Sequence, residues 1–217
     1  MIVELVAVVI VAYLIGSIPF GLIIGRLKGK VDISKHGSGK TGATNVMRTV
    51  GTKAGVVTIA LDLSKALAAV MLARVIVGSD VLTMGGITIN WQVAQVMAGL
   101  AVIAGHNWSI FTKFKGGSGV ATFFGTMYAL YPPVALFGTG VWAGVAVRSR
   151  YMSMGSILGV LATWCVMVPL TIFYELPPVY LVYGLIAAAL VLYQHRGNIR
   201  RLRLGVERRL GEGEKTG

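Results

Sequence analysis

The sequence predicts an all-α, polytopic integral membrane protein with about seven transmembrane helices, some of them short. Of its 217 residues, 55% are hydrophobic and only 13% are charged, and the mean hydropathy is +0.76. These values are typical of membrane proteins and unlike those of soluble domains. Apolar segments also recur along the whole chain, separated by polar connections. The single cysteine, Cys165, lies in an apolar run, which excludes a disulfide framework and a cysteine metal site.

Seven apolar segments lie at about residues 2–25, 54–78, 91–105, 120–131, 134–147, 154–173 and 178–194. A crossing needs about 20 residues, so the first, second and sixth segments are long enough. Gly16, Ser17 and Pro19 interrupt the first segment, and we expect them to kink it. Pro132-Pro133 separates the short fourth and fifth segments. These two are one kinked helix, two short helices or a re-entrant hairpin.

The distribution of positive charge decides among these arrangements. If residues 26–53 are cytoplasmic and every segment crosses, all but two of the 20 Lys and Arg residues lie inside. The exceptions, Lys65 and Arg74, fall within the second segment. Fusing residues 120–147 into one crossing would place the basic C-terminal tail outside, against the positive-inside rule. We therefore predict seven spans, or five spans and a hairpin, with the N-terminus outside and the C-terminus inside.

This topology brings the polar, motif-like segments to the cytoplasmic face. They comprise residues 32–48, 105–119, 148–156 and 193–202. Long glycine-rich loops between spans are uncommon unless they have a function. Four of them on one face predict a shared site at the inner membrane surface. Residues 1–203 are predicted to form one membrane-embedded domain, and residues 204–217 a polar, flexible cytoplasmic tail.

The first of these loops, Ser34–Arg48, reads SKHGSGKTGATNVMR and is rich in glycine, hydroxyl and basic residues. Glycine tolerates positive φ, so the backbone N–H groups can turn toward one anion, which nearby cations would hold. The alternative is a basic connector. GSGKTG resembles the Walker A pattern, but Ser34 stands where that pattern needs glycine and the flanks are membrane spans, which disfavours a P-loop nucleotidase. The candidate phosphate-binding residues are Gly37, Ser38, Gly39, Lys40, Thr41, Gly42, Thr44, Asn45 and Arg48.

A second glycine-rich turn, in GHNWSIFTKFKGGSGVAT, precedes the fourth apolar segment. Its candidate phosphate-binding residues are Lys115, Gly116, Gly117 and Ser118. The amides at a helix start favour an anion, so two cradles on one face indicate two phosphorylated substrates or one large one. His106 is either catalytic or a structural hydrogen-bonding residue at a helix end.

Three further polar features complete the predicted site. Ser156 either contacts substrate or helps to cap the next helix. His195 and Asn198, three residues apart, share a face if their segment is helical; the alternative is a basic helix end that binds anionic lipid. Asp62 and Lys65 lie inside the second span, where they are expected to pair. The sequence shows no His, Asp and Glu grouping with metal-ligand spacing, so we predict no metal and no cofactor.

Taken together, these motifs resemble a known family. GSIPFG, GSGKTGATNVMR, GHNWSIFTKFKGGSGVAT, RYMSMGS and HRGNIRRL, in this order, resemble the bacterial acyl-phosphate:glycerol-3-phosphate acyltransferases, the PlsY family. The resemblance covers nearly the whole chain. It implies transfer of a fatty acyl group from acyl phosphate to glycerol 3-phosphate, which gives lysophosphatidic acid and phosphate and opens phospholipid synthesis.

The resemblance also implies roles for individual residues. The first loop would form the phosphate cradle and Arg48 would pair with a substrate phosphate. Ser156, His195 and Asn198 would contact glycerol 3-phosphate, so that these three and Arg48 are the candidate catalytic residues. The implied partners are the two substrates and membrane lipids, without nucleic acid, and a monomer suffices. The implied location is the bacterial inner membrane, multi-pass, with the active site facing the cytoplasm.

Two departures from the family pattern concern charge. Lys40 stands where the family usually has Asn, and Ser118 where it usually has Lys. We hypothesise that Lys40 replaces the missing ammonium group near Ser118. Two alternative functions remain: a membrane transporter or binding protein for a small phosphorylated anion, and a catalytically altered family member. A transporter is expected to carry its polar residues near the middle of the membrane, whereas here they cluster at one surface.

Overall fold

The structure, a computed structural model, describes residues 1–84 and 87–212, and these are mostly helical. The elements of the N-terminal half are α1 (Ile2–Ser17), α2 (Phe20–Gly29), the 3₁₀ helix η1 (Ile33–Lys35), α3 (Ala43–Thr49), α4 (Thr52–Val77), β1 (Leu82–Met84), β2 (Ile87–Ile89) and α5 (Trp91–Asn107). Those of the C-terminal half are the 3₁₀ helix η2 (Ile110–Thr112), α6 (Val120–Leu130), α7 (Pro132–Ser149), α8 (Met152–Phe173), α9 (Pro178–Gln194) and α10 (Arg196–Arg203). The prediction of an all-α membrane protein is confirmed, apart from one short antiparallel hairpin, β1–β2.

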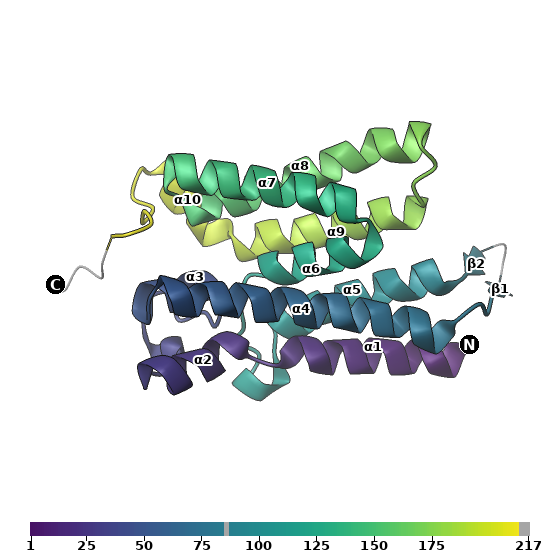
Figure 1. The fold of residues 1–217 in the computed structure, drawn as a ribbon, viewed down its shortest axis with the longest axis horizontal. Helices are drawn as coiled ribbons and strands as arrows, with labels where there is room; N and C mark the ends of the chain where they lie inside the picture. Colours follow the sequence, from purple (N-terminus) through teal and green to yellow (C-terminus); the bar gives the residue numbers. More distant parts are fainter. Residues whose placement is uncertain (85–86, 213–217) are drawn as a thin grey trace.

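The long helices run along the long axis of the molecule (Figure 1). Helices α1, α4 and α5 pack together, α7 packs against α8, and α6 lies between the two groups through contacts with α4 and α7. The N-terminus and the strands β1 and β2 lie at one end, whereas α2, α3 and α10 lie at the other.

The predicted spans correspond to helices in the structure. Four are long and apolar enough to cross a membrane: Ile2–Gly29, Thr52–Val77, Trp91–Thr112 and Met152–Phe173. A fifth is added if Pro178–Gln194 and Arg196–Arg203, which meet at a 61° bend, count as one broken span. A multi-span protein is thereby confirmed for the described residues, and the total of seven stays a prediction. The predicted interruption of the first span separates α1 from α2 at Ile18 and Pro19.

The segments on either side of Pro132-Pro133 form two helices and not one. Tyr131 is extended, with φ −155° and ψ 92°, and the two prolines occupy the start of α7. Proline suits the first turn of a helix because the N–H groups there have no helical acceptor. Helix α6 has 11 residues, about 16 Å at 1.5 Å per residue. It therefore ends well short of the roughly 30 Å of a hydrocarbon core.

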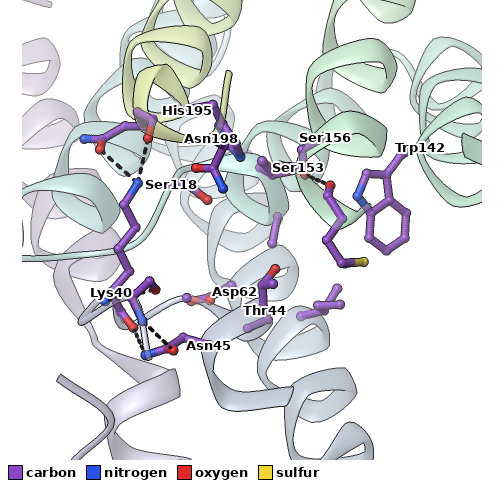
Figure 2. A pocket seen from close by; sticks show the side chains of 18 of the residues that line it. Lys40, Thr44, Asn45, Asp62, Ser118, Trp142, Ser153, Ser156, His195 and Asn198 are labelled. Carbon is purple, nitrogen blue, oxygen red and sulfur yellow. Dashed lines mark hydrogen bonds between the residues drawn. The ribbon is translucent and has the colours of Figure 1, made fainter. Parts of the chain in front are cut away.

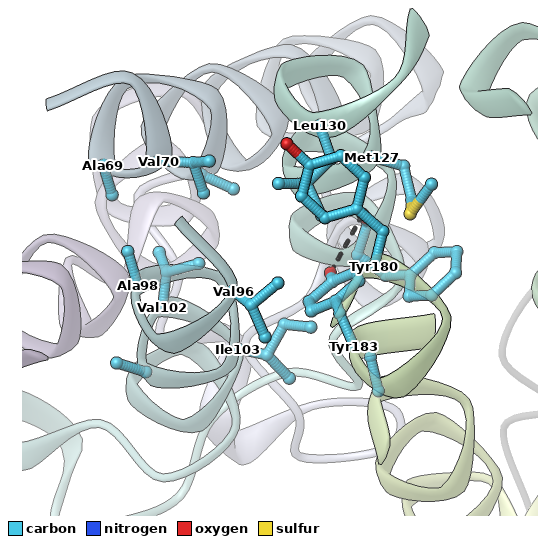
Figure 3. Packing of buried hydrophobic residues seen from close by; sticks show 14 of the residues in the cluster. Ala69, Val70, Val96, Ala98, Val102, Ile103, Met127, Leu130, Tyr180 and Tyr183 are labelled. Carbon is cyan, nitrogen blue, oxygen red and sulfur yellow. Dashed lines mark hydrogen bonds between the residues drawn. The ribbon is translucent and has the colours of Figure 1, made fainter. Parts of the chain in front are cut away.

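Small residues and two tyrosines hold the bundle together. A Cβ at Gly16 or Gly105 would collide with the backbone of the facing helix, so α1 and α5 touch closely, as is usual where lipid removes the hydrophobic driving force between helices. Figure 3 shows Val102 and Ile103 of α5 beside residues of α4 and α6, with Tyr180 and Tyr183 of α9 closing the cluster. The Tyr183 hydroxyl donates to the Phe123 carbonyl at 3.3 Å. This core holds α4, α5, α6 and α9 together.

Candidate functional site

A cavity of about 520 Å³ lies at the end of the bundle that carries α3 and α10, within the size range of small-molecule sites. One part of its wall is polar and basic, with Lys40, Arg48 and His195. Another part is apolar and formed mainly by α4, α6 and α7. Figure 2 shows Lys40 and Trp142 on opposite sides of it. The cavity therefore suits a ligand with a charged head and an apolar body.

Four helices begin at this cavity. Its wall includes Ala43 and Thr44 of α3, Val120 and Ala121 of α6, Met152 and Ser153 of α8, and Arg196, Gly197 and Asn198 of α10. The first N–H groups of a helix have no acceptor within the helix and carry partial positive charge. Their convergence makes the polar part of the cavity suitable for an anion.

The buried amide of Asn45 organises the first loop. Its Nδ2 donates to the carbonyls of Ile33, His36 and Lys40 at 2.9–3.0 Å, and its Oδ1 accepts the Ser38 N–H at 3.1 Å. Gly37 has φ +59°, and a Cβ there would collide with Asn45 Oδ1. Asn45 thus shapes the loop that places Ser38 and Lys40 at the cavity.

The second glycine turn is locked to the first loop. The N–H groups of Gly116 and Gly117 donate to the carbonyls of Asn107 and His106 at 3.1 and 2.9 Å, and the Thr41 N–H donates to the Gly116 carbonyl at 3.3 Å. These amides are used to fold the turn. The groups of this loop that reach the cavity are Ser118 and the first residues of α6.

A buried charged cluster lies beneath this turn. Lys65 Nζ is 2.8 Å from Asp62 Oδ1 and donates to the Ile18 carbonyl at 2.8 Å, so the predicted pairing of Asp62 with Lys65 is confirmed. His106 Nδ1 lies 3.2 Å from Lys65 Nζ and 3.5 Å from Asp62 Oδ1. The other edge of the His106 ring is so close to Gly117 that no side chain fits there. The cluster therefore fixes the position of the glycine turn relative to α4.

His195 and Ser156 present acceptors to the cavity. His195 is 5% exposed, and its Nδ1 lies 2.8 Å from the Val191 carbonyl. A carbonyl only accepts, so Nδ1 carries the proton and Nε2 of the neutral ring is an acceptor. The Ser156 hydroxyl donates to the Met152 carbonyl at 2.8 Å, which leaves its lone pairs for a substrate.

Two cations reach into the cavity from the first loop and α3. Lys40 Nζ donates to the Gln194 carbonyl at 2.7 Å (Figure 2), which joins the loop to the end of α9. Burial, together with the charges of Arg196 and Arg201, lowers the pKa of Lys40 to about 8. Arg48 Nε is buried without a hydrogen-bond partner among the described residues. Both groups gain from an anion in the cavity.

Glu207, in the segment predicted to be a tail, was missed by the sequence analysis. It is 6% exposed, and its Oε1 accepts from Ser153 Oγ at 2.8 Å and from Asn198 Nδ2 at 2.7 Å, while Arg201 Nε donates to Oε2 at 2.7 Å. Burial opposes its ionisation, but these hydrogen bonds hold the pKa of Glu207 below its ordinary value. The available signal was a single acid within the basic stretch 196–209. Flexibility of residues 204–217 stays a prediction, and residues 213–217 lie outside the described residues.

Most of the sequence-predicted site residues meet at the cavity. Its wall contains Ser38, Lys40, Gly42, Thr44, Asn45, Arg48, His106, Ser118, Ser156, His195 and Asn198. Outside the wall lie Gly37, Gly39, Thr41, Lys115, Gly116 and Gly117, all of which belong to the two interlocked loops. Lys115 is exposed. No group of three or more His, Cys, Asp or Glu side chains suited to a metal occurs in residues 1–84 and 87–212.

Comparison with known proteins shows the family of this chain. A sequence model described as glycerol-3-phosphate acyltransferase matches residues 6–205. The chain belongs to the glycerol-3-phosphate acyltransferase family. It is 47% identical over 212 residues to glycerol-3-phosphate acyltransferase 3 of Dehalococcoides mccartyi, covering 98% of both chains. It is 41% identical over 203 residues to glycerol-3-phosphate acyltransferase 2 of Moorella thermoacetica, covering 94% of this chain and 96% of that one.

Two crystal structures of a glycerol-3-phosphate acyltransferase share the fold. They show PlsY, an integral membrane enzyme, in a glycerol 3-phosphate form and in a lysophosphatidic acid form. The TM-scores are 0.81 and 0.80 at 39% identity, with 95% of this chain covered in each case. At this identity and coverage the likeness extends over the whole family domain.

We predict that Glu207→Ala damages the site, although Glu207 lies outside the two glycine-rich loops. Removing the carboxylate leaves the buried donors of Ser153 and Asn198 without an acceptor. Each buried group left unsatisfied costs about 1–3 kcal/mol. We expect a lower thermal midpoint in detergent and weaker binding of glycerol 3-phosphate, measured by calorimetry. Glu212→Ala, an exposed acid of the same segment, is the matched control. An unchanged midpoint in Glu207→Ala would refute the structural importance of these hydrogen bonds.

Proposed function

We propose that this chain transfers a fatty acyl group from an acyl phosphate to glycerol 3-phosphate, producing lysophosphatidic acid and inorganic phosphate. The observation that carries the proposal is one cavity that joins an anion site built from helix starts to an apolar wall. Both substrates carry a phosphate, and one also carries an acyl chain. The names of the relatives and the two ligand forms of PlsY support the same reaction.

The polar end of the cavity would bind the two phosphate groups. Lys40 and Arg48 would supply full charges, and the starts of α6 and α10, which lie in the same wall, would add backbone N–H groups. Arg48 would use its unpartnered Nε for a charge-assisted hydrogen bond. Lys40 and Ser118 line the same part of the wall (Figure 2), which supports the hypothesis that Lys40 supplies the ammonium group absent at position 118.

The chemistry requires positioning more than a protein nucleophile. The 1-hydroxyl oxygen of glycerol 3-phosphate attacks the acyl carbonyl carbon, and the bond from that carbon to the phosphate oxygen breaks. The hydroxyl proton passes to the departing phosphate or to His195 Nε2, which the hydrogen bond at Nδ1 leaves as an acceptor. Asn198 and Ser156 would orient the glycerol moiety. Holding both anions in line and stabilising the developing charge supplies the rate enhancement.

The acyl chain would lie along the apolar wall. Ile59 and Leu63 of α4 and Val120, Ala121 and Phe124 of α6 line this part of the cavity. Burying a methylene group there contributes about 0.8 kcal/mol relative to water. This contribution fixes the reactive carbonyl at the junction of the polar and apolar walls.

A direct assay tests the proposed function. Purified full-length protein is incubated with hexadecanoyl phosphate and glycerol 3-phosphate, and released phosphate and lysophosphatidic acid are measured together. We expect equal amounts of both products, dependent on both substrates. Arg48→Ala should abolish most of the product, whereas Lys35→Ala, which changes an exposed lysine of the same loop, should leave it unchanged. Binding of glycerol 3-phosphate without lysophosphatidic acid would favour a transporter or binding protein.

We predict that Lys40 imposes a pH limit on this activity. Its pKa near 8 means that the ammonium form, which binds phosphate, is present below about pH 8 and is lost above it. The apparent KM for glycerol 3-phosphate or acyl phosphate should therefore rise as the pH is raised from about 7 to about 9. Lys40→Arg, whose charge persists at these pH values, should remove the rise. A rise of the same size in Lys40→Arg would contradict the assignment.

We also propose that the active site faces the cytoplasm of a bacterial cell, with the N-terminus outside. The support is the concentration of Lys and Arg at the end of the bundle that carries the cavity. In a Cys165→Ala background, single cysteines at Ser34 and Ser79 probe opposite ends. An impermeant thiol reagent applied to intact cells should label the cysteine at position 79 and leave that at position 34 unlabelled until the membrane is opened. The reverse pattern would invert the proposed orientation.

A further inference from the structure

The apolar part of the cavity ends at a hydrogen bond between α6 and α7. Tyr128 and Thr139 both line the cavity, and the Tyr128 hydroxyl lies 2.9 Å from Thr139 Oγ1. The Thr139 hydroxyl donates to the Ala135 carbonyl of its own helix at 2.8 Å. A hydroxyl has one proton, so Tyr128 is the donor to Thr139. The bond therefore ties two neighbouring helices together across the cavity wall.

The position of this bond along the helices marks the deep end of the cavity. On α6 the lining residues Val120, Ala121, Phe124 and Tyr128 lie on successive turns of one face. At 1.5 Å per residue, Tyr128 lies about 12 Å beyond Val120, which begins the helix at the polar end. Thr139 lies about 15 Å before the end of α7 at Ser149. The two residues thus meet at similar depth from the two helix ends.

The walls beside this bond are bulky and firmly held. Trp142, one turn from Thr139 on the same face of α7, lines the cavity between that bond and the cavity mouth. Its backbone packs closely against Gly155 and Gly159 of α8, where a Cβ would collide. An acyl chain that lies along the apolar wall meets the Tyr128 ring, which is held by its hydrogen bond to Thr139. Beside it lies the Trp142 ring, on a helix that packs tightly against α8.

We propose that the hydrogen-bonded pair Tyr128–Thr139 is the end stop that sets the acyl chain length this enzyme prefers. The inference rests on the proposed acyl transfer and adds the residues that select among donors. Chains that end before the pair gain burial with each methylene group. Longer chains must displace the Tyr128 ring or leave the wall, and lose that gain.

The experiment compares kcat/KM for dodecanoyl, tetradecanoyl, hexadecanoyl and octadecanoyl phosphate at saturating glycerol 3-phosphate, in purified full-length protein. Tyr128→Ala removes the ring and the hydrogen bond, and should shift the preference toward longer chains. The expected change is about fourfold in the ratio of kcat/KM values for each methylene group that becomes buried. Tyr128→Phe keeps the ring and should give a smaller shift in the same direction. Ala121→Leu narrows the wall nearer the polar end and should shift the preference toward shorter chains.

Phe137→Ala is the matched control, since Phe137 is an exposed aromatic residue of α7 outside the cavity. It should leave the ratios unchanged. Thr139→Ala removes the acceptor and leaves Tyr128 in place, so it tests the same bond if Tyr128→Ala lowers the thermal midpoint. Activity that falls equally for all four donors in the Tyr128 and Thr139 variants would overturn the inference and leave acyl transfer standing. No transfer by the unmodified protein with any donor would instead refute the proposed function itself.

Discussion

Electrostatic repulsion at one end of the helix bundle is the constraint on which this structure depends. Four helix starts, two cations of the first loop and α3, and Arg196 and Arg201 of α10 surround one cavity. Like charges near one another disfavour the charged forms. Burial first, and then the charges of Arg196 and Arg201, lower the pKa of Lys40. Glu207 offsets part of the repulsion by pairing with Arg201. A substrate phosphate would offset much of the remainder, so the free site is prepared for an anion.

Backbone and amide hydrogen bonds keep this repelling arrangement in place. Asn45 shapes the first loop, the Thr41 N–H joins it to the second glycine turn, and the Asp62–Lys65 pair with His106 fixes that turn from below. The supporting groups are buried in the bundle, where a missing hydrogen bond is costly. Because these supporting groups hold the loops in place, the groups that face the cavity can keep some of their hydrogen-bonding capacity unused. Asn45, which the sequence suggested as a phosphate ligand, has a mainly architectural set of contacts.

The sequence predicted the elements of this molecule better than the contacts between them. Hydropathy located the apolar helices, because that signal is local. The prolines at positions 132 and 133 marked a break between two segments, but only the distribution of Lys and Arg argued against one kinked helix. Glycine-rich, basic loops on one predicted face correctly indicated where the cavity lies. Lys40, Arg48, His195 and Asn198 reach the cavity as expected, whereas Lys115 is exposed and the Gly116 and Gly117 amides fold their own turn. Which way a loop residue turns depends on partners that are distant in sequence.

The same limit explains why Glu207 and the Tyr128–Thr139 bond were missed. Glu207 follows a basic helix and looks like part of a solvated tail until Ser153, 54 positions earlier in the chain, is seen beside it. The most direct test of the account is the structure of this protein with glycerol 3-phosphate bound. We predict the phosphate group within hydrogen-bonding distance of Arg48 or Lys40 and of N–H groups at the starts of α6 or α10, with the glycerol moiety beside His195 and Asn198. A phosphate bound on the exposed lysines 113 and 115, away from the cavity, would contradict it.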